Sequence, residues 1–144
     1  MKRTPRNAGF SFIEIMIVMS IIGLLMALVG PRLMKGREKA ETQAAAVQIE
    51  NLGAALDTFR LDVGRYPTTQ ENLDALQQRP SSADRWDGPY LKKAIPLDPW
   101  GRRYVYAAPG QSGRPYDLYT LGADGMPGGD GPNRDVTSWE GSSG

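Results

Sequence analysis

The sequence predicts an α+β fold in which a long N-terminal helix packs against a small antiparallel sheet. An apolar run at residues 10–29 is long enough for a membrane-spanning helix, and an amphipathic helical pattern follows it to residue 63. Apolar side chains then alternate at residues 104–106 and 116–121. The loop between these two segments is rich in Gly and Pro, which is typical of a β-hairpin.

The composition excludes several classes of site. The 144 residues include no His and no Cys, so Ser-His-Asp and Cys-His catalytic sites, imidazole or thiolate zinc sites and disulfides are all excluded. The 17 basic and 16 acidic residues give a net charge of +1, without the basic surface that nucleic-acid binding requires. Carboxylates and other oxygen ligands remain available for chemistry.

The N-terminal segment predicts a retained membrane helix. Lys2, Arg3 and Arg6 precede the apolar run, as basic residues do in a secretory signal peptide. A signal peptide, however, has a shorter apolar core of about 7–15 residues and a small-x-small cleavage motif, and Val29-Gly30-Pro31-Arg32 is not one. About 20 residues at about 1.5 Å each span the hydrocarbon core of a bilayer.

Glu14 is the one charged residue in the apolar run. A carboxylate at mid-bilayer costs about 2.5–3.5 kcal/mol, so it indicates a functional role, although an interfacial residue that snorkels is the alternative. Cleavage between Gly9 and Phe10 would create an amino group roughly 6 Å from Glu14 along the helix. The two charges could then neutralise each other between neighbouring subunits.

Residues 9–14, Gly-Phe-Ser-Phe-Ile-Glu, follow a short basic leader and resemble the type III signal of type IV pilins and type II secretion pseudopilins. The resemblance implies that a prepilin peptidase cuts after Gly9 and methylates Phe10, and that Glu14 serves assembly. It also implies a cytoplasmic leader at residues 1–9 and a periplasmic headgroup. Positive-inside counting does not decide this orientation, because basic residues also follow the run, at Arg32, Lys35, Arg37 and Lys39.

We divide the long helix into a transmembrane and filament-core part, residues 10–30, and an amphipathic part, residues 31–64. Pro31 lacks a backbone N–H and clashes with the preceding turn, which predicts a kink or a locally melted segment at Gly30 and Pro31. The apolar positions of the amphipathic part are Ala44, Val47, Ile49, Leu52, Leu56, Phe59 and Val63. We expect Ile49, Leu52, Leu56 and Phe59 to be buried by the sheet.

Residues 65–144 form the predicted α+β headgroup. A short helix is expected at residues 69–76, with Thr69 as its cap and Asn72 in the position of a capping-box acid. Asp98-Pro99-Trp100-Gly101 predicts a turn with a partly buried tryptophan. Four segments, in this order, resemble the major pseudopilin family of type II secretion: residues 66–70 (YPTTQ), 90–93 (YLKK), 98–104 (DPWGRRY) and 116–125 (YDLYTLGADG).

Residues 121–139 are a candidate metal-binding loop. Asp124, Asp130 and Asp135 lie among glycines, and calcium takes six to eight oxygen ligands from carboxylates and backbone carbonyls. The spacing is not that of an EF-hand, and a solvated acidic loop fits the residues equally well. The family resemblance implies a structural Ca²⁺ bound by the Leu121 carbonyl, Asp124 and a closing Asp135, with Asp130 at a variable position.

The resemblance implies a structural subunit of the type II secretion pseudopilus, a helical periplasmic filament that helps export folded proteins across the outer membrane. The implied partners are further copies of the chain, minor pseudopilins, the prepilin peptidase, the inner-membrane assembly platform and membrane lipid. One alternative is a type IV pilin or minor pilin-like subunit of a surface fibre. Another is a membrane-anchored periplasmic enzyme that uses the carboxylates of Asp98, Asp117 or Asp124.

Overall fold

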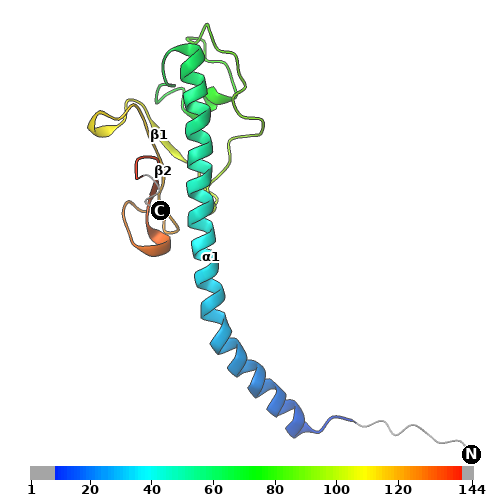
Figure 1. Ribbon diagram of the computed structural model, residues 1–144. Coiled ribbons are helices and arrows are strands. Elements are labelled where there is room, and N and C mark those ends of the chain that lie inside the picture. The colour runs from blue at the N-terminus through cyan, green and yellow to red at the C-terminus, as the bar shows by residue number, and fades with distance from the viewer. Residues whose placement is uncertain (1–8, 141–144) are drawn as a thin grey trace, which may run out of the picture. The chain divides into compact units, whose positions relative to one another are not determined.

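A computed structural model describes residues 9–140 and begins with one long helix (Figure 1). This helix, α1, spans Phe12–Val63, 52 residues. The short 3-10 helices are η1 (Leu73–Leu76), η2 (Gln111–Gly113) and η3 (Gly131–Asn133), and the strands are β1 (Val105–Ala107), β2 (Asp117–Thr120) and β3 (Val136–Thr137). The chain divides into two compact units, one ending at Arg37 and the other beginning at Glu38.

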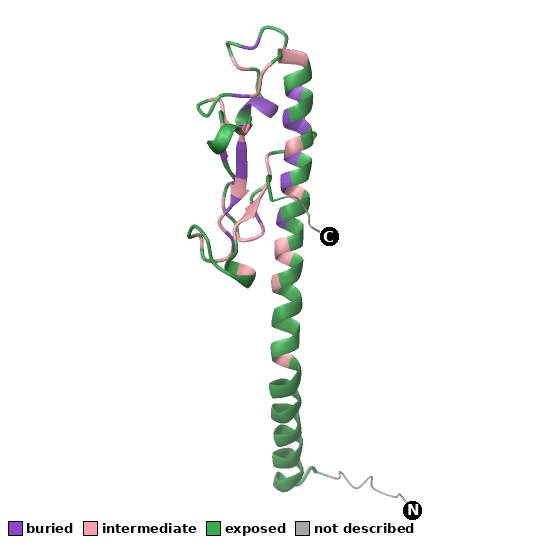
Figure 2. Cartoon of the chain, turned by 60° about the vertical axis from the view of Figure 1, so that its left-hand side comes forward, coloured by how far each residue is buried: buried purple, intermediate pink, exposed green. Residues whose placement is uncertain are grey.

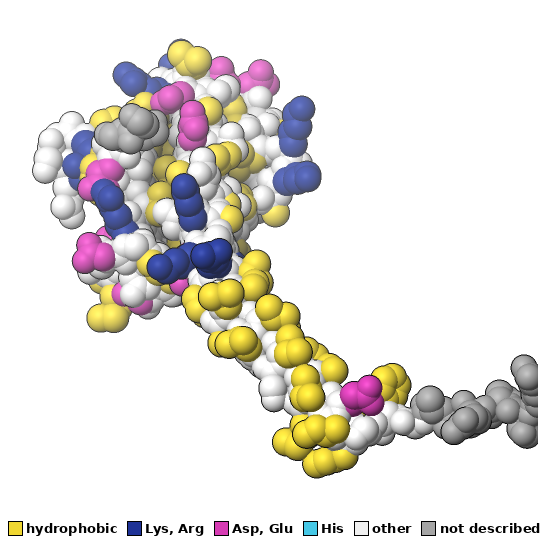
Figure 3. Space-filling model, turned by 60° about the horizontal axis from the view of Figure 1, so that its bottom comes forward, with side chains coloured by type: hydrophobic (Ala, Val, Ile, Leu, Met, Phe, Trp, Pro, Cys, Tyr) yellow, Lys and Arg dark blue, Asp and Glu magenta, His cyan; other side chains and the backbone are white. Residues whose placement is uncertain are grey.

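The described part of the first unit consists mainly of the N-terminal part of α1. Every residue from 10 to 29 is exposed, and hydrophobic side chains cover the helical surface that Figure 3 presents. Helix α1 is long and apolar enough to cross a membrane, and none of its most apolar stretch is buried within the chain. No residue between 9 and 140 covers that surface, so it is suited to lipid or to other copies of the protein.

Helical geometry continues through Gly30 and Pro31 without interruption. The chain is therefore not melted at this point, since a proline in a helix removes one hydrogen bond but leaves the flanking turns to hold the helix. A kink at Pro31 stays a prediction. The division between the two compact units falls seven residues further along, between Arg37 and Glu38, whereas the membrane and amphipathic parts were divided at Gly30.

The second unit contains a three-stranded antiparallel sheet with the order β1-β2-β3. Val105 pairs with Tyr119 and Ala107 with Asp117, which confirms the predicted hairpin. The third strand, β3, was not expected. It pairs with the end of β2 through Tyr119 with Thr137 and Thr120 with Val136, so the chain returns to the sheet after the candidate metal loop.

The core of the second unit lies between α1 and the short elements that follow it. Figure 2 shows the buried positions along one side of the C-terminal half of α1. They are Ala45, Ile49, Leu52, Ala55, Leu56 and Phe59. The four expected core residues are confirmed, but Val47 is 50% exposed and Ala44 is also exposed. Ala45 lies one helical turn before Ile49 and therefore on the same buried face. Ala44 and Val47 lie on the exposed side of the helix.

Side-chain hydroxyls tie this helix and the chain after it to the sheet. The Tyr104 hydroxyl bonds the side-chain carbonyl of Gln48 on α1, and the Tyr106 hydroxyl donates to the Pro67 carbonyl at 2.8 Å. A Cβ on Gly53 would lie 3.2 Å from the Tyr116 hydroxyl. A larger residue at Gly53 would therefore push α1 away from the tyrosine.

The expected helix at residues 69–76 is shorter than predicted. Only Leu73–Leu76 is helical, as the 3-10 helix η1, and the Asn72 side chain caps it by accepting from the Leu73 N–H at 2.7 Å. A reciprocal capping box forms one residue earlier than Thr69. The Thr68 N–H donates to Glu71 at 2.7 Å and the Glu71 N–H donates to the Thr68 hydroxyl at 3.2 Å. Because Glu71, and not Asn72, carries the required carboxylate, the box shifts to Thr68.

Candidate functional site

Glu14 caps the start of its own helix in this chain. The Ser11 N–H donates to Glu14 Oε2 at 3.0 Å, and the Ile15 N–H donates to the Ser11 carbonyl at 3.2 Å. Ser11 is the residue before the helix and Glu14 is its third residue, which is the spacing of a capping box. The Ser-x-x-Glu motif carries this signal, which the sequence reasoning missed.

Phe10 and Gly9 are the other two residues predicted for this site. Phe10 is 82% exposed and Gly9 is also exposed, so the bond between them is open to a peptidase. The structure thus places Gly9, Phe10 and Glu14 within about one and a half helical turns of each other along the chain. A positive charge at Phe10 after cleavage would lie beside a carboxylate that already bonds the neighbouring backbone.

The candidate metal loop begins and ends on adjacent strands. Thr120 of β2 pairs with Val136 of β3, so Leu121 and Asp135 are the next residues outward on the two strands. The register therefore brings together the first and last of the predicted ligands. Sequence reasoning missed the strand that makes this possible, although the β-branched pair Val136-Thr137 is a short strand signal.

Asp135 has one satisfied and one unsatisfied carboxylate oxygen. Its Oδ2 accepts from the Gly128 N–H at 3.0 Å. Its Oδ1 is buried and has no hydrogen-bond partner among the described residues. A buried carboxylate oxygen without a partner is energetically unfavourable, and a bound cation would remove that cost.

Asp124 and Asp130 have different surroundings from Asp135. Asp124 Oδ1 accepts from the Met126 N–H at 3.0 Å, which folds the start of the loop into a tight turn. Asp130 is exposed and precedes η3 without a side-chain capping bond. Within residues 9–140, no group of three or more Asp or Glu side chains gathers closely enough to hold a metal by carboxylates alone.

Two backbone carbonyls near the end of the loop lie against Gly122 at its start. A Cβ on Gly122, which has φ +63°, would lie 2.6 Å from the Asn133 carbonyl oxygen and 2.7 Å from that of Arg134. Only glycine leaves room for these two carbonyls. With the carboxylates of Asp124 and Asp135 in the same loop, the residues present fit an oxygen-coordinated cation such as Ca²⁺.

Two arginines make contacts of this loop, Arg102 from outside it and Arg134 from within it. The Arg102 guanidinium donates to the Gly122 carbonyl, while Arg134 lies 3.4 Å from Glu140 in an exposed ion pair. Arg134, which directly precedes Asp135 in the sequence, is thus paired with Glu140. Arg102, which the sequence reasoning did not single out, ties the loop to the turn before β1.

The carboxylates considered for an enzyme are engaged in structural bonds. Asp98 accepts from the N–H groups of Trp100 at 3.1 Å and Arg102 at 2.7 Å, and from the Thr120 hydroxyl. This carboxylate shapes the predicted turn, in which Trp100 is half-buried and Gly101 has φ +85°. Such an Asx turn is readable from the Asp-Pro pair.

Asp117 is likewise held by its neighbours. The Arg114 guanidinium bonds it at 2.6 Å and the Gln111 N–H bonds it at 2.9 Å. The hydrogen bond from Arg114 lowers the pKa of the Asp117 carboxyl below its usual range. Asp117 is therefore an ionised structural residue at the start of β2.

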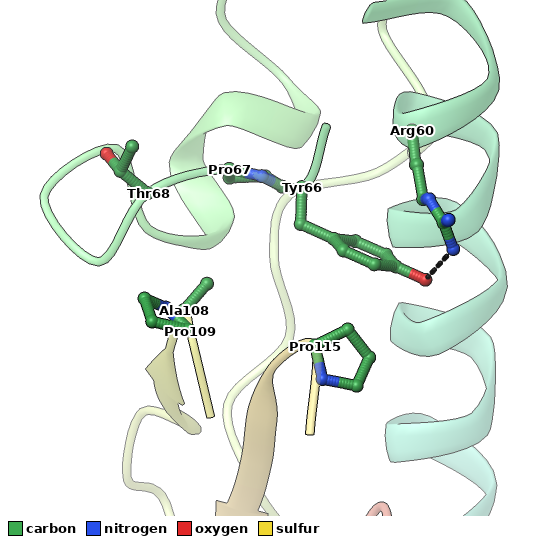
Figure 4. Close-up of a pocket in the computed structure, with 7 residues that line it drawn as sticks. All are labelled: Arg60, Tyr66, Pro67, Thr68, Ala108, Pro109 and Pro115. Atoms are coloured by element: carbon green, nitrogen blue, oxygen red, sulfur yellow. Dashed lines mark hydrogen bonds between the residues drawn. The ribbon is translucent and has the colours of Figure 1, made fainter. Parts of the chain in front are cut away.

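A shallow groove of about 380 Å³ opens beside Tyr66, and none of the seven residues that line it is acidic. Figure 4 shows the Tyr66 ring pointing toward Arg60, with Pro67, Pro109 and Pro115 around it. The Tyr66 hydroxyl donates to Asp57 at 2.8 Å and accepts from Arg60 at 3.4 Å. These bonds fasten the groove wall to α1 and leave no group arranged for catalysis among its lining residues.

Comparison with known protein families identifies two matching regions. Residues 32–139 match the family described as Type II secretion system (T2SS), protein G. Residues 4–30 match the prokaryotic N-terminal methylation motif. The two matches together account for nearly the whole chain, and they meet at the point where the apolar run ends.

Individual relatives agree with these matches. The type II secretion system core protein G of Pseudomonas aeruginosa is 45% identical over 140 residues, covering 94% of this chain and 96% of the relative. The same-named protein of Vibrio cholerae is 41% identical over 142 residues, covering 96% of each chain. A crystal structure of the major pseudopilin of enterohaemorrhagic Escherichia coli superposes with a TM-score of 0.63 at 33% identity, covering 76% of this chain and 96% of that one.

Proposed function

This chain belongs to the type II secretion system protein G family, the major pseudopilins, and from this premise we propose how it is stored and assembled. A major pseudopilin is a structural subunit and not an enzyme. In the proposed cycle, the N-terminal half of α1 holds the subunit in the inner membrane, with the leader in the cytoplasm and the headgroup in the periplasm. The subunit then joins a periplasmic pseudopilus.

One observation carries this proposal: the two halves of α1 have different surroundings. The described residues leave its apolar N-terminal stretch uncovered, whereas its C-terminal half contributes to the core of the folded headgroup. Residues 10–29 can be covered by lipid before assembly and by the same residues of other copies after it. Successive copies would meet through two different surfaces, and such a contact builds an open helix and not a closed ring. The filament core would be made of these helices.

The proposed first step is cleavage after Gly9 and methylation of the new terminus at Phe10. It is supported by the match to the N-terminal methylation motif and by the exposure of both residues. Glu14 would then leave its bond to the Ser11 N–H and pair with the Phe10 ammonium of a neighbouring copy. In the new pair both groups are charged, and the attraction between an ammonium and a carboxylate favours the assembled state in a medium without water.

The partners proposed for this cycle are those that the family requires. They are other copies of the chain, minor pseudopilins, the prepilin peptidase and the inner-membrane assembly platform. The partners would contact the outer surface of the headgroup, because its apolar core residues are buried between α1 and the sheet. No catalytic step is assigned to the chain.

Ca²⁺ is proposed as a structural ion of the loop at residues 121–139. The carbonyl of Leu121 and the carboxylates of Asp124 and Asp135 would hold it, and the buried, unpartnered Asp135 oxygen supports this assignment. Asp130, which is exposed, would complete the ligand set only if its segment moved inward. The bound ion would neutralise the loop carboxylates and order its glycines.

The proposed function is tested by the mass of the chain and by filament formation in a host with and without its prepilin peptidase. We expect loss of residues 1–9 and gain of one methyl group only when the peptidase is present. Glu14→Gln should be cleaved normally and yet assemble at least about tenfold less, because a neutral amide cannot pair with the Phe10 ammonium. Full-length mass in both hosts would contradict the proposal, as would abundant Glu14→Gln filaments.

A further inference from the structure

Three basic residues lie in the eight residues that follow the apolar stretch of α1. Arg32, Lys35 and Arg37 are all exposed, and they lie at the end of the first unit. No acidic residue occurs between Glu14 and Glu38. The segment that contains these three cations therefore carries only positive charge. The cycle proposed above gives them no role, and they oppose the positive-inside rule if the headgroup is periplasmic.

Their distance from the apolar stretch corresponds to the depth of lipid headgroups. At about 1.5 Å per residue, Arg32 lies about 4.5 Å and Lys35 about 9 Å beyond Val29. The headgroup region on each side of the hydrocarbon core is about 5–8 Å thick. Side chains on a helix also tilt toward its N-terminus, so both cations lean back toward the bilayer.

The residues between the cations are typical of the same interface. Leu33 and Met34 are 69% and 68% exposed, so apolar and basic side chains surround the helix at one level. Apolar side chains reach the acyl boundary while Arg and Lys extend their charged ends to the phosphates. A helix inserted in a bilayer meets lipid on every side, so Arg37 on a different face can contribute as well.

We propose that Arg32 and Lys35, assisted by Arg37, bind the phosphate groups of anionic phospholipids in the leaflet nearest the headgroup of the stored subunit. Guanidinium and ammonium groups make charge-assisted hydrogen bonds to phosphate, and near an anionic surface each cation adds to the attraction. These contacts set the depth of α1 in the membrane. Extraction of the subunit into a filament must break them.

The test uses the chain as recovered from membranes, diluted into phosphatidylcholine vesicles so that copies are dispersed. Electron paramagnetic resonance of spin-labelled phosphatidylglycerol and spin-labelled phosphatidylcholine measures which lipid the protein immobilises. We expect a preference for phosphatidylglycerol that drops by about twofold or more in R32Q/K35Q. The preference should also weaken at high salt, because ions screen exposed charges.

The matched control is K92Q/K93Q, which removes two exposed cations from the headgroup. This variant should keep the preference of the unmodified chain. An equal preference in R32Q/K35Q and the unmodified chain would overturn the proposal. So would the absence of any preference in the unmodified chain, which would assign these cations to contacts between copies.

The proposal rests on the proposed membrane storage of the subunit but fails separately from it. The lipid measurement is made on unassembled chains, and label in both leaflets makes it independent of orientation. Any leader still attached contributes equally to all variants and cancels from the comparison. Missing filaments would therefore contradict the proposed function alone, whereas missing lipid selectivity would contradict this inference alone.

Discussion

The two halves of α1 have opposite relations to the rest of the chain. From residue 10 to residue 29 every side chain is exposed, although this is the most apolar part of the sequence. From Ala45 to Phe59, six residues are buried against the headgroup. Both halves are helical, so secondary structure does not separate them. The first half is suited to surroundings outside the chain and the second to the chain's own sheet.

The charged groups differ between the two parts in the same way. In the first, Glu14 accepts from the backbone N–H of Ser11 at the start of the helix. In the second, Glu71 bonds Arg65 at 2.6 Å and 2.8 Å, and Asp117 bonds Arg114 at 2.6 Å. The carboxylates of Glu71 and Asp117 are thus paired with arginines of the headgroup, whereas the carboxylate of Glu14 accepts from a backbone N–H.

The largest expected effect comes from the core half of α1. Phe59→Ala should lower the free energy of unfolding of the headgroup by about 3–5 kcal/mol, because it deletes a fully buried ring. Urea unfolding followed by tryptophan fluorescence measures this change. Leu61→Ala, two residues away and 84% exposed, is the matched control and should change it by less than about 0.5 kcal/mol. Equal effects at the two positions would contradict the assigned core face.

Calcium should stabilise the headgroup and leave the apolar half unaffected. At 100 times its dissociation constant, an ion that binds only the folded state adds about 2.7 kcal/mol to the free energy of unfolding. Asp135→Asn should abolish this gain while keeping the shape of the side chain. Thermal unfolding with Ca²⁺ and with a chelator measures the difference. An unchanged response to Ca²⁺ in Asp135→Asn would remove Asp135 from the ligand set.

A smaller effect is expected from the capping box between α1 and η1. Glu71 belongs to this box, and its hydrogen bonds from Arg65 lower its pKa from 4.5 to about 2. A carboxylate with a lowered pKa stabilises the folded state above its unfolded pKa, and this contribution is lost as the pH falls from 4.5 toward 2. Glu71→Gln should cost about 1 kcal/mol at pH 7, and its difference from the unmodified chain should vanish near pH 2. A stability difference between Glu71→Gln and the unmodified chain that stays constant from pH 7 to pH 2 would contradict a lowered pKa of Glu71.

The smallest expected effect lies in the apolar half. Leu24→Ala should leave the free energy of unfolding of the headgroup in detergent within about 0.5 kcal/mol of its original value, since Leu24 is 72% exposed. The same urea unfolding measures it. A loss comparable to that of Phe59→Ala would show that the apolar half packs on the headgroup, and the comparison between the two halves would fail.

Much of the fold was predictable because it depends on local patterns. The apolar run, the core positions Ile49, Leu52, Leu56 and Phe59, and the hairpin of β1 and β2 each follow from periodicity within one segment. The capping box of Ser11 and Glu14 is equally local and was nevertheless not predicted, because Glu14 was interpreted only as an acid within a membrane helix. Strand β3 was missed since two residues are too few to show alternation.

The sequence by itself determined which residues are apolar, where the leader motif lies and which carboxylates the loop contains. The tertiary structure decided which of these residues meet. Pairing of β2 with β3 places Leu121 and Asp135 one residue beyond the last pair, and the Asn133 and Arg134 carbonyls lie against Gly122. Contacts between residues distant in the chain depend on the packing of all the intervening elements. Spacing along the sequence therefore cannot specify them, whereas the helix and its apolar face depend on a few successive turns.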